Sequence, residues 1–217
     1  MKKLVLIAAA FILMLPSAFA QKGLHAGLKV TPITTWMFNK DFSDAGDELD
    51  YKTTFGYMFG ATVNYHFTDG FGLGADFLYS SQGQNFKSFG EDGAELKVKY
   101  LKIPILLHFN TNSEEVVYFQ GNFGPQFGVL LSGEVQDPSN LIGDVDVKDE
   151  LESLNIGLVL GFGLGFNVHE NFKINAGLRF DGALTSATDS KGIFGTENTT
   201  NVTGGVELGF IYVLPVR

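Results

Sequence analysis

Residues 54–67 read TFGYMFGATVNYHF, and an apolar or aromatic residue occupies every second position. The parity that runs from Phe55 to Phe67 is bulky, whereas the other parity is mostly Gly, Thr and Asn. A period of two residues is typical of a β-strand, because successive side chains point to opposite faces. The stretch therefore predicts a strand with one bulky apolar face and one small, polar face.

The same alternation recurs along the chain. It is clear in two further stretches and noisier in five others, which makes eight predicted strands. The predicted strands are 23–36, 54–67, 71–80, 96–109, 116–131, 155–168, 172–184 and 202–214.

The connections between these strands alternate in length. Short turns are predicted at 68–70, 110–115 and 169–171, and long polar segments at 39–52, 81–95, 132–153 and 185–200. An antiparallel arrangement then places every long loop at one end and the short turns with both termini at the other. Closure removes exposed sheet edges. We therefore expect an all-β fold without helices, an eight-stranded antiparallel up-and-down β-barrel with four long loops at one end.

The polarity of the two faces separates a membrane barrel from a soluble one. A soluble ligand-binding barrel would turn its bulky face inward and charged residues toward water, but here the second face is Gly, Thr, Asn and Ser. Small residues suit a narrow lumen, and Phe, Leu, Val and Tyr suit lipid. Aromatic residues also gather near both strand ends, as interfacial girdles do. We expect a transmembrane barrel, with a soluble periplasmic barrel as the alternative. The girdle residues are Tyr65, Phe67, Phe71, Phe109, Phe172 and Tyr212 at the short-turn end, and Trp36, Phe38, Phe55, Tyr57 and Tyr79 at the other.

The N-terminus has the pattern of a secretory signal peptide. Lys2 and Lys3 precede an apolar run over residues 4–15, and Ala18 and Ala20 form a small-residue cleavage pattern. We expect a signal peptide over 1–20 and one barrel domain over 21–217. The mature domain would carry 13 basic and 24 acidic residues, a net charge of −11. That acidity argues against nucleic-acid partners, and the lack of cysteine excludes disulfides, thiolate metal sites and an N-terminal lipid anchor.

Three strand segments resemble a known family. Residues 100–107 read YLKIPILL, residues 124–131 read GPQFGVLL and residues 161–166 read GFGLGF. They resemble the PorT-like outer-membrane β-barrel family, in which a "YLEIPLLL"-type strand precedes a "GPYFGYLL"-type strand and a "GLGFG"-type strand. The resemblance covers essentially the whole mature chain and implies an eight-stranded outer-membrane barrel. It also implies the lipid bilayer as a partner, and proteins of secretion or surface machinery that contact the long loops.

The candidate chemical groups favour a protein that is not an enzyme. All four histidines, His25, His66, His108 and His169, fall near the short-turn end, whereas a barrel hydrolase would need its histidine near the long loops. They lie on separate strands without a local metal-ligand spacing, so we expect no catalytic, cofactor or metal site. An enzyme acting on lipid or peptide is the alternative. It would require a polar pair or triad near one of the loop hydroxyls, which are Ser81, Ser132, Ser153 and Thr185.

Seventeen of the 24 acidic residues fall in the four long segments, so calcium binding has to be considered. Asp144 and Asp146 match positions 1 and 3 of a calcium loop, but position 5 is Lys148 and position 6 is Asp149 instead of Gly. The pattern indicates acidic, solvated extracellular loops.

Charged residues on the inward parity are the most informative candidates. Counted from the short-turn end, six of them lie roughly five to nine residues along their strands, which predicts one layer near mid-membrane. Three are basic and three acidic, as a low-dielectric interior requires. We expect a structural layer centred on Arg179 and Glu207, with Asp76 reaching across; a proton or ion relay is the alternative. The six residues are Lys29, Asp76, Lys102, Arg179, Asp181 and Glu207. Together these features lead us to expect that the protein has a structural, adhesion or secretion-accessory role.

Overall fold

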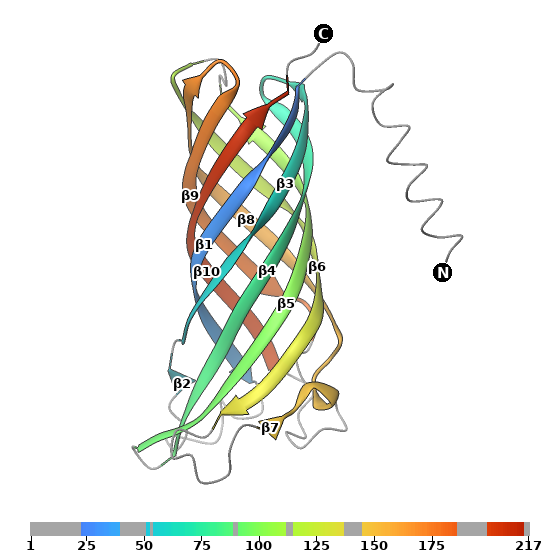
Figure 1. Ribbon diagram of the computed structural model, residues 1–217, viewed down its shortest axis with the longest axis vertical. Helices are drawn as coiled ribbons and strands as arrows, with labels where there is room; N and C mark the ends of the chain where they lie inside the picture. The colour runs from blue at the N-terminus through green and yellow to red at the C-terminus, as the bar shows by residue number, and fades with distance from the viewer. Residues whose placement is uncertain are drawn as a thin grey trace, which may run out of the picture.

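Eight long antiparallel strands form a closed barrel in the computed structural model (Figure 1). They are β1 (Leu24–Asn39), β3 (Thr54–Thr68), β4 (Phe71–Ser88), β5 (Glu91–Asn110), β6 (Val117–Gln136), β8 (Leu154–His169), β9 (Phe172–Ala183) and β10 (Thr199–Val213). The structure describes residues 23–39, 51–52, 54–88, 91–111, 115–136, 145–185 and 199–214.

Each long strand pairs with its neighbours in the chain, and β1 closes the ring by pairing with β10, where His25 lies opposite Val213. Two short strands, β2 (Tyr51–Lys52) and β7 (Val145–Asp146), extend the sheet beside β4 and β6. The start of β1 and the end of β10 both lie at the short-turn end (Figure 1). The eight-stranded barrel predicted from the alternation is confirmed.

Two of the predicted loop boundaries are wrong. β4 continues to Ser88 and β5 begins at Glu91, so most of the predicted loop 81–95 is a paired hairpin. β6 likewise continues to Gln136, and the predicted loop 132–153 also contains β7 and a 3₁₀ turn, η1 (Lys148–Glu150), where no helix was expected. Polar residues on both faces concealed these strands, because period two is visible only where one face is apolar.

Three predicted segments lie wholly or mostly outside the residues that the structure describes. The signal peptide over 1–20 and the loop segments 40–50 and 186–198 lie outside the described residues. Among the residues that are described, no helix is long and apolar enough to cross a membrane.

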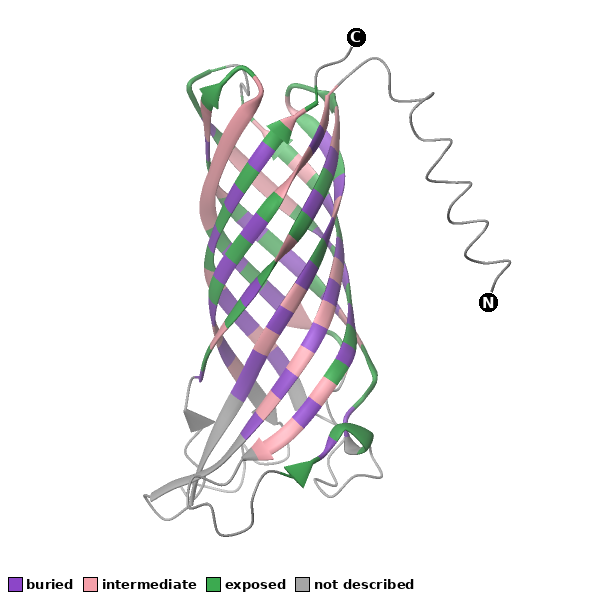
Figure 2. Cartoon of the chain, in the orientation of Figure 1, coloured by how far each residue is buried: buried purple, intermediate pink, exposed green. Residues whose placement is uncertain are grey.

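The two faces of the barrel differ as the sequence predicted. Burial alternates along most of the barrel wall, although the first half of β9 is uniformly half-buried (Figure 2). Outward side chains such as Leu28, Phe59 and Leu160 are more than half exposed, whereas Met58, Leu78, Leu106 and Leu130 are buried in the lumen. Small inward residues let the strands approach closely, because a Cβ at Gly60 would collide with the backbone of the neighbouring strand. An apolar outer band of this kind suits lipid.

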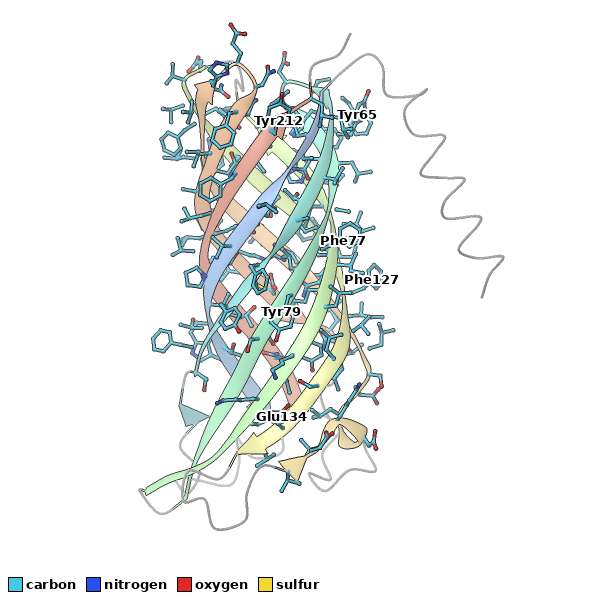
Figure 3. All side chains as sticks on the ribbon, viewed as in Figure 1. Tyr65, Phe77, Tyr79, Phe127, Glu134 and Tyr212 are labelled. Carbon is cyan, nitrogen blue, oxygen red and sulfur yellow. The ribbon has the colours of Figure 1, made fainter. Side chains whose placement is uncertain are left out.

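Aromatic side chains stand at both borders of this band (Figure 3). Near the short-turn end the rings of Tyr65 and Phe67 lie 5.0 Å apart, and those of Phe71 and Phe109 lie 5.3 Å apart. Toward the long-loop end, the ring of Phe59 lies 5.4 Å from that of Tyr79. Edge-to-face and offset ring pairs at these distances are attractive, and amphipathic rings are typical of the two membrane interfaces.

Beyond the long-loop end of this band, β4, β5 and β6 continue as a wall that the other strands do not match in length (Figure 1). The inner side of the wall carries a small hydrophobic core, here named the rim cluster. Gly133 gives η1 room to dock, since a Cβ there would lie 2.5 Å from Leu151 Cδ1. The backbone N–H of Val147 donates to the Gly133 carbonyl at 2.9 Å. The rim cluster comprises Leu96, Val98, Tyr100, Leu130, Val147 and Leu151.

Candidate functional site

The six charged residues predicted for the lumen are all buried and lie together, and we name them the charge layer. None is more than 8% exposed. Five strands supply them: β1, β4, β5, β9 and β10. The members are Lys29, Asp76, Lys102, Arg179, Asp181 and Glu207.

Arg179 is the centre of the charge layer. Its Nη1 lies 3.1 Å from Glu207 Oε2 and 3.4 Å from Asp76 Oδ2, which is on the far side of the barrel. Its Nε donates to Asp181 Oδ1 at 2.8 Å, and its Nη2 donates to Gln126 Oε1 at 3.1 Å. One guanidinium therefore binds three carboxylates and an amide, which suits the fixed fork of its N–H donors.

Two lysines complete the charge layer. Lys29 Nζ lies 3.0 Å from Asp76 Oδ2 and 3.4 Å from Glu207 Oε1. Lys102 Nζ donates to Asp181 Oδ2 at 3.0 Å. Each of the six charges thus has at least one opposite partner within hydrogen-bonding or ion-pair distance, and the layer is neutral as a whole. Pairing of this kind offsets the cost of burying charge in a low-dielectric interior.

Glycines on the neighbouring strands flank the long basic side chains. Arg179 lies between Gly161 on β8 and Gly205 on β10. Lys29 likewise lies between Gly60 on β3 and Gly209 on β10. Because an eight-stranded barrel is only just wide enough to be filled by side chains, a guanidinium can occupy its centre only if its neighbours are small. The two basic side chains thus have the smallest possible cross-strand neighbours on both sides.

A small polar cavity lies next to the charge layer on the long-loop side. Gln82, Asn201 and Thr203 contribute to its lining, and Lys102 and Asp181 also border it. Its volume is about 10 Å³, which is close to the space that one water molecule needs. Asn201 Nδ2 donates to Gln82 Oε1 at 2.6 Å. The cavity can hold a water molecule but no organic substrate.

The histidines separate into two groups. His25, His66 and His108 meet in the lumen near the short-turn mouth, whereas His169 is exposed at the end of β8. Within the described part of the chain, no group of three or more His, Cys, Asp or Glu side chains is arranged to hold a metal ion.

The loop hydroxyls do not assemble a catalytic centre among the described residues. Thr185 Oγ1 accepts a hydrogen bond from the Ile156 backbone N–H at 2.9 Å, and Ser153 is exposed. The histidines lie at the opposite end of the barrel. Asp146 Oδ1 accepts from the Lys148 backbone N–H at 2.9 Å and so stabilises the start of η1, while Asp144 lies outside the described residues.

The sequence did not predict two features: the contact of Gln126 with the charge layer and the docking of residues 147–151 in the rim cluster. Gln126 binds the central arginine and shares the inward parity with Gly124 and Gly128, so the alternation could have identified it. The docking of Val147 and Leu151 on the wall had no such signal, because residues far apart in the chain create that core.

These features define a class: a transmembrane β-barrel whose lumen is filled by side chains. The family model described as outer membrane protein beta-barrel domain matches residues 19–189, and the chain belongs to this family. It is therefore an outer-membrane protein embedded in the lipid bilayer. Family membership and the apolar outer face disfavour the soluble alternative.

Solved structures agree with this fold. Neisserial surface protein A (NspA) shares 13% sequence identity, with 87% of this chain and 96% of that chain covered and a TM-score of 0.53. OprG from Pseudomonas aeruginosa shares 14% identity, with 88% and 94% covered and a TM-score of 0.50. At such identities the likeness establishes the fold alone. No curated protein sequence matches the chain.

Proposed function

We propose that this protein is a non-enzymatic outer-membrane barrel that presents its long-loop end at the cell surface, in a structural, adhesion or secretion-accessory role. The charge layer is the observation that supports the proposal. Its side chains fill the lumen in the middle of the barrel, and each charge is paired with an opposite charge of the same layer. A lumen of this kind offers no wide channel. The role of the charge layer is to fill the barrel and fix the strand register.

A PorT-like kinship is part of the same proposal. The segments that carry the resemblance lie on β5, β6 and β8. Two of them supply Lys102 and Gln126 to the lumen, and the third supplies Gly161 beside Arg179. The motif residues thus serve the interior of the barrel, which agrees with a shared architecture. Proteins of secretion or surface machinery would then be the partners of the long loops.

Planar-bilayer recording tests the filled lumen. The purified barrel should show no stable conductance, because neutralised side chains occupy its centre and leave no continuous path for ions. Stable, ion-selective conductance of porin size would contradict the proposal.

The orientation can be tested with single cysteines, since the natural chain has none. Lys148, in η1, and Glu170, in the turn between β8 and β9, are both exposed and lie at opposite ends. On intact cells, a membrane-impermeant maleimide should label Lys148→Cys and spare Glu170→Cys, because long loops of such barrels face outward. Labelling of position 170 alone would reverse the topology.

The signal peptide over 1–20 completes the proposal, because an outer-membrane barrel must first be exported. N-terminal sequencing of the protein from isolated membranes should begin at Gln21. A start at Met1 would rule out cleavage.

A further inference from the structure

Three imidazoles lie in contact at the short-turn mouth of the lumen. The ring centroids of His25 on β1 and His66 on β3 are 4.5 Å apart. Those of His66 and His108 on β5 are 5.9 Å apart. His66 is thus the middle member of a row that crosses from the first strand of the barrel to the fourth long strand.

Glycines and backbone contacts hold this row in place. A Cβ at Gly72 would lie 2.8 Å from His66 Nδ1, and a Cβ at Gly74 would lie 2.8 Å from His108 Nε2. The backbone N–H of His66 also donates to the carbonyl of Gly23, at 3.2 Å, where the described chain enters the barrel. The rings therefore occupy space that β4 leaves open, and they connect the start of β1 with the end of β3.

The surroundings oppose a positive charge on these rings. Lys173 on β9 acts electrostatically on His25 and His66 and lies 5.3 Å from the ring centroid of Tyr118 on β6. His108 is influenced by Lys29 of β1 and by Asp76 of β4. Asp76 is the acidic group among these neighbours, and it is already engaged by Lys29 and Arg179. Asp69, in the turn between β3 and β4, acts on Lys173.

Protonation would therefore disturb the row. Imidazole changes its charge between about pH 5 and 8, and two positive rings at these separations repel each other, more strongly in a lumen than in water. His108 Nε2 is buried and has no hydrogen-bond partner among the described residues, so nothing there stabilises a second ring proton. In the unfolded chain all three rings can accept protons without this repulsion, so acid favours opening.

We infer that His25, His66 and His108 form a proton-responsive latch at the short-turn mouth, closed when the rings are neutral and loosened when they are protonated. The latch acts on the mouth and leaves the charge layer intact, because the ion pairs of that layer join other residues. It adds a regulatory property that the proposed structural role does not require.

Hydrogen exchange on the full-length barrel in lipid nanodiscs tests the latch. After correction for the intrinsic rate, amides of residues 23–27, 64–72 and 106–110 should exchange about tenfold faster at pH 5 than at pH 7.5, because local opening controls exchange. Amides of residues 177–181, beside the charge layer, should not change. His66→Gln should reduce the pH response several-fold, since it removes the member that contacts both others. His169→Gln is the matched control, because His169 is exposed at the same end, and the response should persist in it.

Two results would overturn the latch: an unchanged pH response in His66→Gln, or a response lost equally in His169→Gln. If His66→Gln does not fold, NMR titration of the wild-type protein decides. The three lumenal rings should then titrate in coupled steps that perturb one another's resonances, as interacting sites do. Independent single-step titrations of His25, His66 and His108 would contradict the proposal.

Discussion

β5 crosses two environments, and its apolar side changes between them. From Leu101 to Phe109 the outward positions are apolar and the inward ones include Lys102 and His108. From Leu96 to Tyr100 the inward positions are apolar, and the outward ones are lysines. The strand keeps the same face toward the barrel axis throughout.

The change shows where the bilayer ends. A strand surrounded by lipid gains by turning apolar side chains outward, and polar groups then remain for the lumen, where they must be paired. Where water surrounds the wall, the ordinary rule for a soluble sheet returns, and the apolar face is buried under β7 and η1. The charge layer and the rim cluster are thus two solutions to the same problem. The following predictions test the difference.

Breaking the charge layer should have the largest effect. Glu207→Gln leaves Arg179 and Lys29 with one carboxylate fewer, and removing one partner of a buried ion pair costs about 3–5 kcal/mol. Adding Arg179→Met restores neutrality, so the double variant should lose less than the sum of the two single losses. Urea unfolding in lipid vesicles, followed by fluorescence of Trp36, the sole tryptophan, measures the unfolding free energies of Glu207→Gln, Arg179→Met and the double variant. Strict additivity would mean that the two residues do not interact.

A charge on the lipid face should have the next largest effect. Leu160 lies in the middle of β8 and is 52% exposed on the outer face. Leu160→Arg should cost about 2–4 kcal/mol, because a basic side chain near the bilayer midplane is poorly solvated. Lys99→Arg on the wall is the control and should leave the same unfolding free energy unchanged. An unchanged unfolding free energy in Leu160→Arg would mean that lipid does not surround β8 at this depth.

The rim cluster should respond locally. Leu151→Ala removes a buried side chain and should weaken docking of η1 by about 2–3 kcal/mol, through lost burial and the cavity left behind. Hydrogen exchange should then accelerate in residues 145–153, with no change in residues 177–181. Faster exchange throughout the barrel would show instead that the wall and the membrane span unfold as one unit.

A substitution on the outer face of the wall should change the unfolding free energy least. Lys99 Nζ lies 3.7 Å from Glu134 Oε1, and both side chains are more than one third exposed. Lys99→Met should therefore change the unfolding free energy by less than about 1 kcal/mol, because exposed ion pairs are weak and screened by salt. A larger loss in low salt that disappears in high salt would assign more weight to this pair.

Alternation made the membrane span readable from the sequence, and it also placed the six charged residues on the inward parity. Arg179 and Glu207 lie on adjacent strands, so their proximity follows from the strand order. The contact between Lys29 and Asp76 crosses from β1 to β4 and depends on side-chain conformation, which the sequence pattern does not give. The hairpin over 81–95 gave no signal, since wall residues such as Ser81 and Lys97 need no lipid-facing apolar row. Noise in the predicted strand 96–109 was informative, because it came from the exchange of the apolar face near Tyr100.

The pairing of β1 with β10 has a consequence for how the molecule is made. The seam joins His25 to Val213, so the first and last strands of the described chain are hydrogen-bonded neighbours. Contacts between distant parts of a chain form slowly, because a long loop must close before they can form. Without β10 the other strands could form only an open sheet with two unpaired edges, a template for aggregation. A chain truncated before residue 199 therefore cannot close, and both edges have to be shielded until β1 and β10 meet.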